Sequence, residues 1–106
     1  MSISTHVLDT TRGVPAPGVG VRLERLAGTG WEPAGTGVTD ADGRLRLAGD
    51  APSPGRHRLI FDAAAHLGPD AFFPEIVIVF EVTDPAARLH VPLLLSPYGY
   101  TTYRGS

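Results

Sequence analysis

The side chains in this sequence best suited to acid–base chemistry are its four histidines. His6 and His90 both lie within short apolar stretches of the kind that form strands, where a buried imidazole needs hydrogen-bond partners. A neutral imidazole, with an ordinary pKa of ~6.5, can accept a proton from water near neutral pH. Each of these two residues is a candidate general base. The alternative for each is a hydrogen-bonded structural histidine or an exposed one.

The two other histidines have less to favour a chemical role. His57 stands between Arg56 and Arg58 after a loop rich in proline and glycine, which predicts a solvated strand end. His66 follows three alanines in a helix-sized segment, where we expect a surface position. No two histidines stand two or four residues apart and there are no cysteines, so the sequence holds no local metal-binding motif. We expect neither a metal nor a cofactor, although a metal site built from distant strands stays open.

Two arginines share one face of a short expected strand. Arg44 and Arg46 alternate with Leu45 and Leu47, so the guanidinium groups point to the side opposite the leucines. An arginine offers a planar fork of hydrogen-bond donors and stays charged, which suits a carbonyl-rich or anionic small ligand. The alternative is an ordinary solvated strand face.

The end of the sequence is unusually aromatic. Tyr98, Tyr100 and Tyr103 fall within six residues and are followed by Arg-Gly-Ser. Terminal residues are commonly frayed and polar. If this aromatic segment is ordered, it must be tied into a sheet or an interface.

The elements that must position these residues are strands. Glycines and prolines separate short apolar stretches about ten residues apart, which is the pattern of an all-β protein. We expect one short helix at 63–67, ended by Gly68 and Pro69. The fold class predicted is an all-β, two-sheet sandwich of about eight strands. The expected strands are 3–8, 19–26, 31–39, 44–47, 56–62, 75–83, 88–96 and 98–103.

Length and composition exclude several kinds of protein. The 106 residues suit a single domain over 1–106, with no room for a second nucleotide-binding fold. A formal net charge of -2 gives no reason to expect a nucleic-acid or membrane partner. The sequence has no lysine for a Schiff base and no cysteine for a thiolate or a disulfide. The longest apolar run, 76–80, is too short to span a bilayer, and no signal peptide is visible, so we expect a cytoplasmic protein.

Three segments resemble the signatures of one family, the transthyretin-related 5-hydroxyisourate hydrolases. They are STHVLDT at 4–10, GVTDADGR at 37–44 and HVPLLLSPYGYTTYRGS at 90–106. The last is the most specific, because the hormone-carrying transthyretins lack the final Tyr-Arg-Gly-Ser. Members often carry a further histidine two places before the third signature, where this sequence has Arg88.

The resemblance implies a fold, an assembly and a reaction. The fold would be a prealbumin-like sandwich, assembled as a homotetramer of two dimers with the sites in the channel between them. The reaction would be hydrolysis of 5-hydroxyisourate, the product of urate oxidase, to 2-oxo-4-hydroxy-4-carboxy-5-ureidoimidazoline, without a cofactor. The catalytic residues implied are His6, Arg44, His90 and Ser106. The residues implied to bind substrate are Tyr103, Arg104 and Gly105.

Two other classes of protein remain in view. One is a small-ligand carrier with the same sandwich, although the bulk of Tyr103 would narrow a channel that a small residue leaves open. The other is a non-catalytic sandwich module of the carboxypeptidase-regulatory or adhesion type, in which a turn like that at 39–43 also occurs. Such a module has no need for His6, Arg44 and His90 together with an ordered tail.

Overall fold

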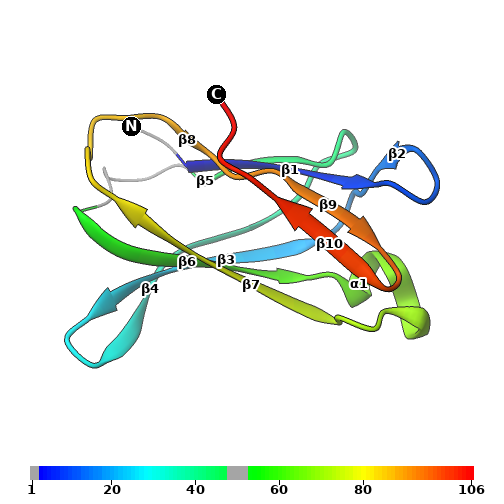
Figure 1. The fold of residues 1–106 in the computed structure, drawn as a ribbon, viewed down its shortest axis with the longest axis horizontal. Helices are drawn as coiled ribbons and strands as arrows, with labels where there is room; N and C mark the ends of the chain where they lie inside the picture. Colours follow the sequence, from blue (N-terminus) through cyan, green and yellow to red (C-terminus); the bar gives the residue numbers. More distant parts are fainter. Residues whose placement is uncertain (1–2, 48–52) are drawn as a thin grey trace.

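The protein is a sandwich of two β-sheets that face each other (Figure 1). Residues 3–47 and 53–106, the part of the chain described by this computed structural model, form ten strands, a one-turn α-helix and a short 3-10 helix. The strands are β1 (Ile3–Asp9), β2 (Val14–Pro15), β3 (Gly20–Ala27), β4 (Gly30–Val38), β5 (Arg44–Leu47), β6 (Gly55–Asp62), β7 (Glu75–Val82), β8 (Leu89–His90), β9 (Leu93–Ser96) and β10 (Gly99–Thr102). The helices are α1 (Ala64–Leu67) and η1 (Gly68–Asp70).

The two sheets differ in how they are connected. One has four antiparallel strands in the order β4-β3-β6-β7. The other has six strands and is centred on β1, whose first half pairs with β5 and β8 and whose second half pairs with β2 and β9, with β10 outside β9. The prediction of an all-β, two-sheet sandwich with one short helix is therefore confirmed.

The strand boundaries differ from the expected ones at two places. The stretch expected as one strand at 88–96 is two strands, β8 and β9, separated at Val91 and Pro92. Pro92 has no backbone N–H and cannot continue a ladder of hydrogen bonds. No strand was expected between 8 and 19, yet Val14 and Pro15 pair with the end of β1 as β2.

The alternation of side chains along β1 places the core on one side. Ile3, Thr5 and Val7 are buried between the sheets, whereas Ser4 and His6 lie on the opposite, partly exposed face, as the period of two predicts. A fully buried aliphatic side chain stabilises the fold by roughly 1.5–3 kcal/mol. The largest fully buried apolar side chains are Phe61, Ile3, Leu59, Ile76, Leu93 and Leu95.

The single α-helix covers one end of the sandwich. It begins without a side-chain cap and ends at Gly68, whose φ of 72° suits a residue without a Cβ. In the described residues, no helix has the length and apolar character needed to cross a membrane. Within α1, the partly buried Leu67 packs against the core.

Candidate active site

The outer face of the six-stranded sheet brings together residues from both ends of the chain. In β1, His6 lies opposite Arg44 of β5, and Ser4 lies opposite Arg46. On its other side, Ser4 pairs with His90 of β8 in parallel. Residues directly opposite each other in neighbouring strands project their side chains from the same face of a sheet. The pairing therefore gathers two histidines, two arginines and a serine on one surface.

The turn before β5 fixes Arg44 and His6 relative to each other. Asp40 accepts hydrogen bonds at Oδ1 from the backbone N–H groups of Asp42 and Arg44, each at 2.9 Å. Gly43 has a φ of 74° and packs against the backbone of β1, where a side chain would collide. His6 Nε2 donates to the carbonyl oxygen of Asp42 at 2.9 Å, because a carbonyl can only accept. In neutral His6 the unprotonated nitrogen is consequently Nδ1.

His90 is enclosed on two sides by backbone and by a hydroxyl. Its Nδ1 lies 2.9 Å from Ser4 Oγ. On its other side the final segment of the chain runs antiparallel to β8, and the Gly105 N–H donates to the His90 carbonyl oxygen at 2.8 Å. The C-terminal residues are thus tied to the six-stranded sheet beside His90.

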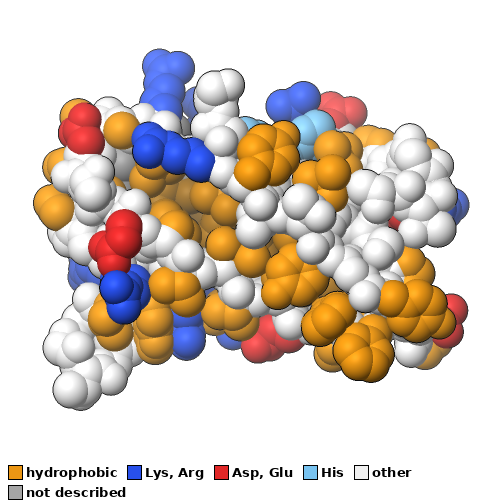
Figure 2. Space-filling view, in the orientation of Figure 1, with side chains coloured by type: hydrophobic (Ala, Val, Ile, Leu, Met, Phe, Trp, Pro, Cys, Tyr) orange, Lys and Arg blue, Asp and Glu red, His pale blue; other side chains and the backbone are white. Residues whose placement is uncertain are grey.

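These residues border a polar cleft of about 530 Å³ on the outer face of the sheet. Figure 2 shows arginine and histidine side chains along the upper edge of the molecule, where Figure 1 places β1, β5, β8 and the chain end. The predicted site residues that line the cleft are Arg44, His90 and Ser106. Arg46, which the sequence pairs with Arg44 as suited to an anionic ligand, also lines it, as do Ser4 and Arg88, which were not expected in the site. The side chains that line the cleft include three arginines and one carboxylate, that of Asp40, so the cleft is cationic.

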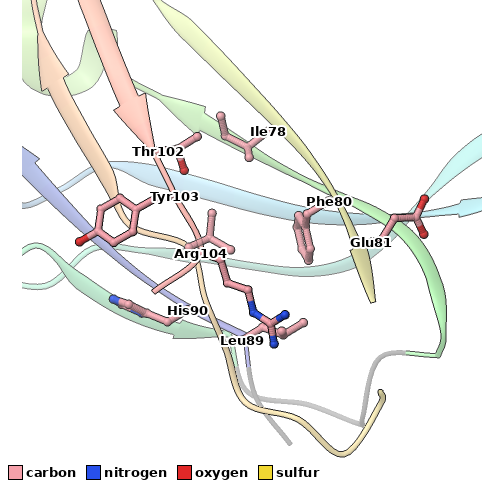
Figure 3. A pocket seen from close by; sticks show the side chains of 9 residues that line it. Ile78, Phe80, Glu81, Leu89, His90, Thr102, Tyr103 and Arg104 are labelled. Atoms are coloured by element: carbon pink, nitrogen blue, oxygen red, sulfur yellow. The ribbon is translucent and has the colours of Figure 1, made fainter. Parts of the chain in front are cut away.

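A second, mostly apolar pocket of about 230 Å³ adjoins the first and shares His90 with it (Figure 3). Tyr103 and Arg104 line this pocket together with Phe80 and Ile78 of β7. In Figure 3 the rings of Tyr103 and His90 point to the same side of the final segment, and the Arg104 side chain points toward Leu89. The expected site residues are therefore divided between two adjoining cavities, and His6 and Gly105 line neither.

The surroundings of His90 favour its neutral form. The pKa of His90 lies below its ordinary value of 6.5, first because burial penalises the imidazolium, and then because His6 and Arg44 are close. A hydrogen bond with the Ser4 backbone raises the pKa of His90, but by less than the other effects lower it. A histidine that stays neutral at physiological pH can act as a base.

The expectation of a solvated His57 is wrong. This side chain is 1% exposed, stacks on Phe80 with ring centroids 5.9 Å apart, and contacts the Gly55 carbonyl oxygen through Nδ1 at 3.1 Å. The reason is the alternation of β6, in which His57 shares the core face with Leu59 and Phe61, while Arg56 and Arg58 point outward. His57 is a core residue.

The expectation of a surface position for His66 is also wrong. Its side chain is only 11% exposed, and its Nε2 lies 2.8 Å from Oδ2 of the buried Asp9. The same carboxylate accepts the backbone N–H groups of Thr11 and Arg12 through Oδ1. His66 thus links α1 to the end of β1 and takes no part in the cleft.

The described residues hold no group of three or more His, Cys, Asp or Glu side chains that could bind a metal ion. Among the cleft residues that the sequence analysis did not assign to the site, Ser4 is the one whose side chain contacts His90. The available signal was its position two residues before His6, on the same face of the strand. Its contact with His90 could not be read from the sequence, because that contact crosses from one end of the chain to the other.

Comparisons with known proteins show the family to which this chain belongs. The model of the HIUase/Transthyretin family matches residues 3–105. The 5-hydroxyisourate hydrolase of Salmonella typhimurium is 46% identical over 109 residues, covering 98% of this chain and 80% of the relative. The solved structure of Klebsiella pneumoniae 5-hydroxyisourate hydrolase matches with a TM-score of 0.86 and 34% identity over 100% of both chains. Transthyretin from Sparus aurata matches with a TM-score of 0.89 and 31% identity, over 97% of this chain and 95% of that one. With the signature segments at both ends of its sequence and this sandwich between them, the chain belongs to the HIUase/Transthyretin family.

Proposed function

We propose that this protein hydrolyses 5-hydroxyisourate to 2-oxo-4-hydroxy-4-carboxy-5-ureidoimidazoline in the degradation of urate. The observation that carries the proposal is the cationic cleft in which Arg44, His90 and Ser106 meet, with His6 directly opposite Arg44 in the sheet. The names of the bacterial relatives support the same activity. An enzyme of this kind acts on a small, carbonyl-rich ring, which suits a cleft lined by guanidinium groups.

The reaction needs an activated water molecule and stabilisation of negative charge on a ring carbonyl. His90 accepts a proton from the water as the water oxygen attacks that carbonyl. Arg44 donates hydrogen bonds to the oxyanion that forms, and Arg46 and Arg88 add positive charge at the same cleft. The ring C–N bond then breaks, the leaving nitrogen takes up a proton, and the product carries a new carboxylate.

His6 has a distinct place in this mechanism. Its Nε2–H is held by the Asp42 carbonyl, so its free nitrogen, Nδ1, is the one able to exchange a proton. We assign to it the orientation of the water or the return of a proton to the leaving nitrogen. The Ser106 hydroxyl, at the border of the cleft, supplies a further hydrogen bond to substrate.

The segment Tyr103–Gly105 shapes the side of the site that faces the apolar pocket. Tyr103, which is 57% exposed, serves as a wall, and Arg104 brings a charge to the boundary between the two cavities. Gly105 lets the backbone approach His90. Deletion of residues 103–106 is expected to abolish hydrolysis while the sandwich still folds, and full activity in a folded truncation would remove the tail from the mechanism.

A ligand carrier is the second candidate, and the match to Sparus aurata transthyretin favours it as far as the fold is concerned. The fold alone does not separate carrier from enzyme, because both kinds of neighbour have TM-scores above 0.8. The chemistry of the cleft favours an enzyme, because a carrier has no need for a neutral histidine beside an arginine.

The proposed assembly is a homotetramer made of two dimers. Both β7 and β10 are edge strands, and apolar side chains lie exposed on or beside them, as Figure 2 shows for the side of the molecule they occupy. Val79 is 53% exposed, Phe72 68% and Tyr98 77%. Open sheet edges with exposed apolar side chains are surfaces for pairing between chains. Sedimentation that found only an 11.2 kDa monomer at micromolar concentration would contradict the assembly.

The activity is tested by following the absorbance decay of freshly generated 5-hydroxyisourate. Wild-type protein should accelerate the decay, and His90→Ala and His6→Ala should each lose about 10²–10⁴-fold in turnover. Arg22→Ala is the control, because Arg22 is exposed on the four-stranded sheet, away from the cleft. Decay at the uncatalysed rate in the presence of folded wild-type protein would refute the proposed activity.

A further inference from the structure

Ser4 contacts the candidate base without a role in the reaction proposed above. It lies on β1 between Arg46 on one side and His90 on the other. Its Oγ is 2.9 Å from His90 Nδ1, and this is the one side-chain hydrogen bond of the His90 ring within residues 3–47 and 53–106. A hydroxyl can either donate or accept, so the contact bears on which ring nitrogen carries the proton.

Three contacts together fix the orientation of the His90 ring. Ser4 Oγ meets Nδ1, and Gly105 packs so closely on the opposite edge that a methyl group there would lie 2.5 Å from Cδ2. The His90 backbone is itself held between β1 and the chain end. With Nδ1 occupied, Nε2 is the nitrogen left for chemistry at the cleft.

We propose that Ser4 is a positioning residue whose hydroxyl accepts the Nδ1–H of His90 and so leaves Nε2 as the basic nitrogen. This inference rests on the proposed hydrolase function. When water attacks the substrate, its O–H bond breaks and the proton forms the Nε2–H bond of His90. The Nδ1–H bond stays intact throughout, and Ser4 continues to accept from it in the resulting imidazolium.

A hydroxyl suits this position better than a carboxylate. The charged and titratable groups around His90 on the cleft side are His6 from β1, Arg44 and Arg46 from β5, and Arg88 and Asp40 at the border of the cleft. On the side of the apolar pocket they are Glu81 of β7, Tyr103 and Arg104. Elsewhere in the same molecule, a carboxylate, that of Asp9, contacts a histidine side chain, that of His66. A carboxylate at position 4 would favour the charged form of His90. Ser4 orients the ring without adding a negative charge, so His90 remains a neutral base among the arginines.

The protonation site can be measured directly by NMR on protein labelled with ¹⁵N-histidine. At about pH 8, well above the ordinary histidine pKa of ~6.5, the ring nitrogens of the neutral form are distinguished by their ¹⁵N shifts. The His90 signals are assigned by their loss in His90→Gln. We expect the proton on Nδ1 in the wild-type protein. A proton on Nε2 would overturn the proposal, whether or not the protein hydrolyses 5-hydroxyisourate.

Variants at position 4 test the consequence for turnover. Ser4→Ala should lower kcat about three- to tenfold, the effect of one neutral hydrogen bond, with little change in KM, and should move the His90 proton toward Nε2. Ser4→Thr keeps the hydroxyl and should restore both. Thr10→Val is the matched control, because it removes a partly buried hydroxyl that bonds the Leu95 carbonyl at the other end of β1. A rise in KM with unchanged kcat and an unchanged His90 spectrum would make Ser4 a substrate contact and refute the positioning role.

Discussion

Gly105 lies directly against the imidazole of His90. Its N–H donates to the His90 carbonyl oxygen at 2.8 Å, and a Cβ at position 105 would stand 2.5 Å from His90 Cδ2 and 3.2 Å from Cγ. Real Cβ atoms do not approach that closely, so either the ring or the final segment would have to move. Position 105 thus controls where the candidate base is held.

Gly105→Ala is therefore expected to lower kcat by about 10²-fold, the effect of displacing a catalytic group by roughly 1 Å. Steady-state kinetics and thermal unfolding of the same preparation would separate lost activity from lost folding. Gly30→Ala is the control, because nothing lies within 4 Å of a methyl group there. Wild-type kinetics in Gly105→Ala would mean that His90 is not the group on which turnover depends.

The activity should persist to mildly acid pH. The pKa of His90 is lowered from 6.5 by burial and by the nearby His6 and Arg44. The neutral base is therefore lost only when the pH falls below this lowered pKa. The acid limb of the kcat/KM profile should lie below pH 6.5, and in Arg44→Gln it should move upward. An acid limb at or above the ordinary histidine value would argue against His90 as the base.

Arg44 should not tolerate replacement by lysine. Lysine keeps the positive charge but lacks the planar fork of hydrogen-bond donors. The oxyanion would still be attracted by the charge but would lose the directed hydrogen bonds from the guanidinium group. We expect kcat to fall by about 10²-fold in Arg44→Lys, comparable to the removal of one oxyanion donor. The matched change Arg22→Lys, on the exposed face of the other sheet, should leave kcat unchanged. Equal activity of the two variants would show that charge alone suffices.

The pair of Asp9 and His66 should stabilise the fold in a pH-dependent way. Burial would raise the pKa of Asp9, but hydrogen bonds from His66 and from the Arg12 and Thr11 backbone outweigh this and lower it below 3.8. A carboxyl whose pKa is lowered on folding stabilises the folded state at any pH above its pKa in the unfolded chain. This contribution disappears as the pH falls through its pKa in the folded state. His66→Ala should cost about 1–3 kcal/mol near neutral pH, measured by urea denaturation, with activity retained. The difference between wild type and Asp9→Asn should shrink toward acid pH, and a difference independent of pH would contradict the pairing.

His57 should matter for stability and not for catalysis. His57→Ala leaves a cavity beside Phe80 and should lower the free energy of unfolding by about 2–4 kcal/mol, with kcat per folded molecule unchanged. Within the described residues, the buried Nε2 of His57 has no hydrogen-bond partner. His57→Leu should therefore recover most of the loss, because it fills the space without an unpaired polar atom. A stability of His57→Leu no better than that of His57→Ala would point to a needed polar contact.

The sequence predicts those parts of the structure that depend on local alternation. The two faces of β1 follow from the period of two, as does the position of Arg44 and Arg46 opposite two leucines. The same rule applied to β6 places His57 with Leu59 in the core, whereas its two arginine neighbours favour exposure to solvent. For His57, the alternation of side chains along the strand predicts burial better than the types of the neighbouring residues.

Contacts between distant segments could not be predicted in this way. The link between His66 and Asp9 joins residues 57 positions apart, and that between Ser4 and His90 joins residues 86 apart. Neither has a local pattern, because each depends on which strands become neighbours in the folded sheet. The signature segments supplied the residues of the proposed site, whereas the sheet pairing determined which of them meet in one cleft.

The central place of β1 has a consequence for the order in which the protein forms. The four-stranded sheet uses only elements between Gly20 and Val82, joined to their neighbours by antiparallel pairing. The six-stranded sheet must wait for β8, β9 and the chain end to reach β1, and such long-range pairing is slow. A nascent chain on the ribosome can hold one sheet while β1 still lacks most of its partners. We therefore expect the proposed site to be complete only after Ser106, which lines the cleft, has left the ribosome.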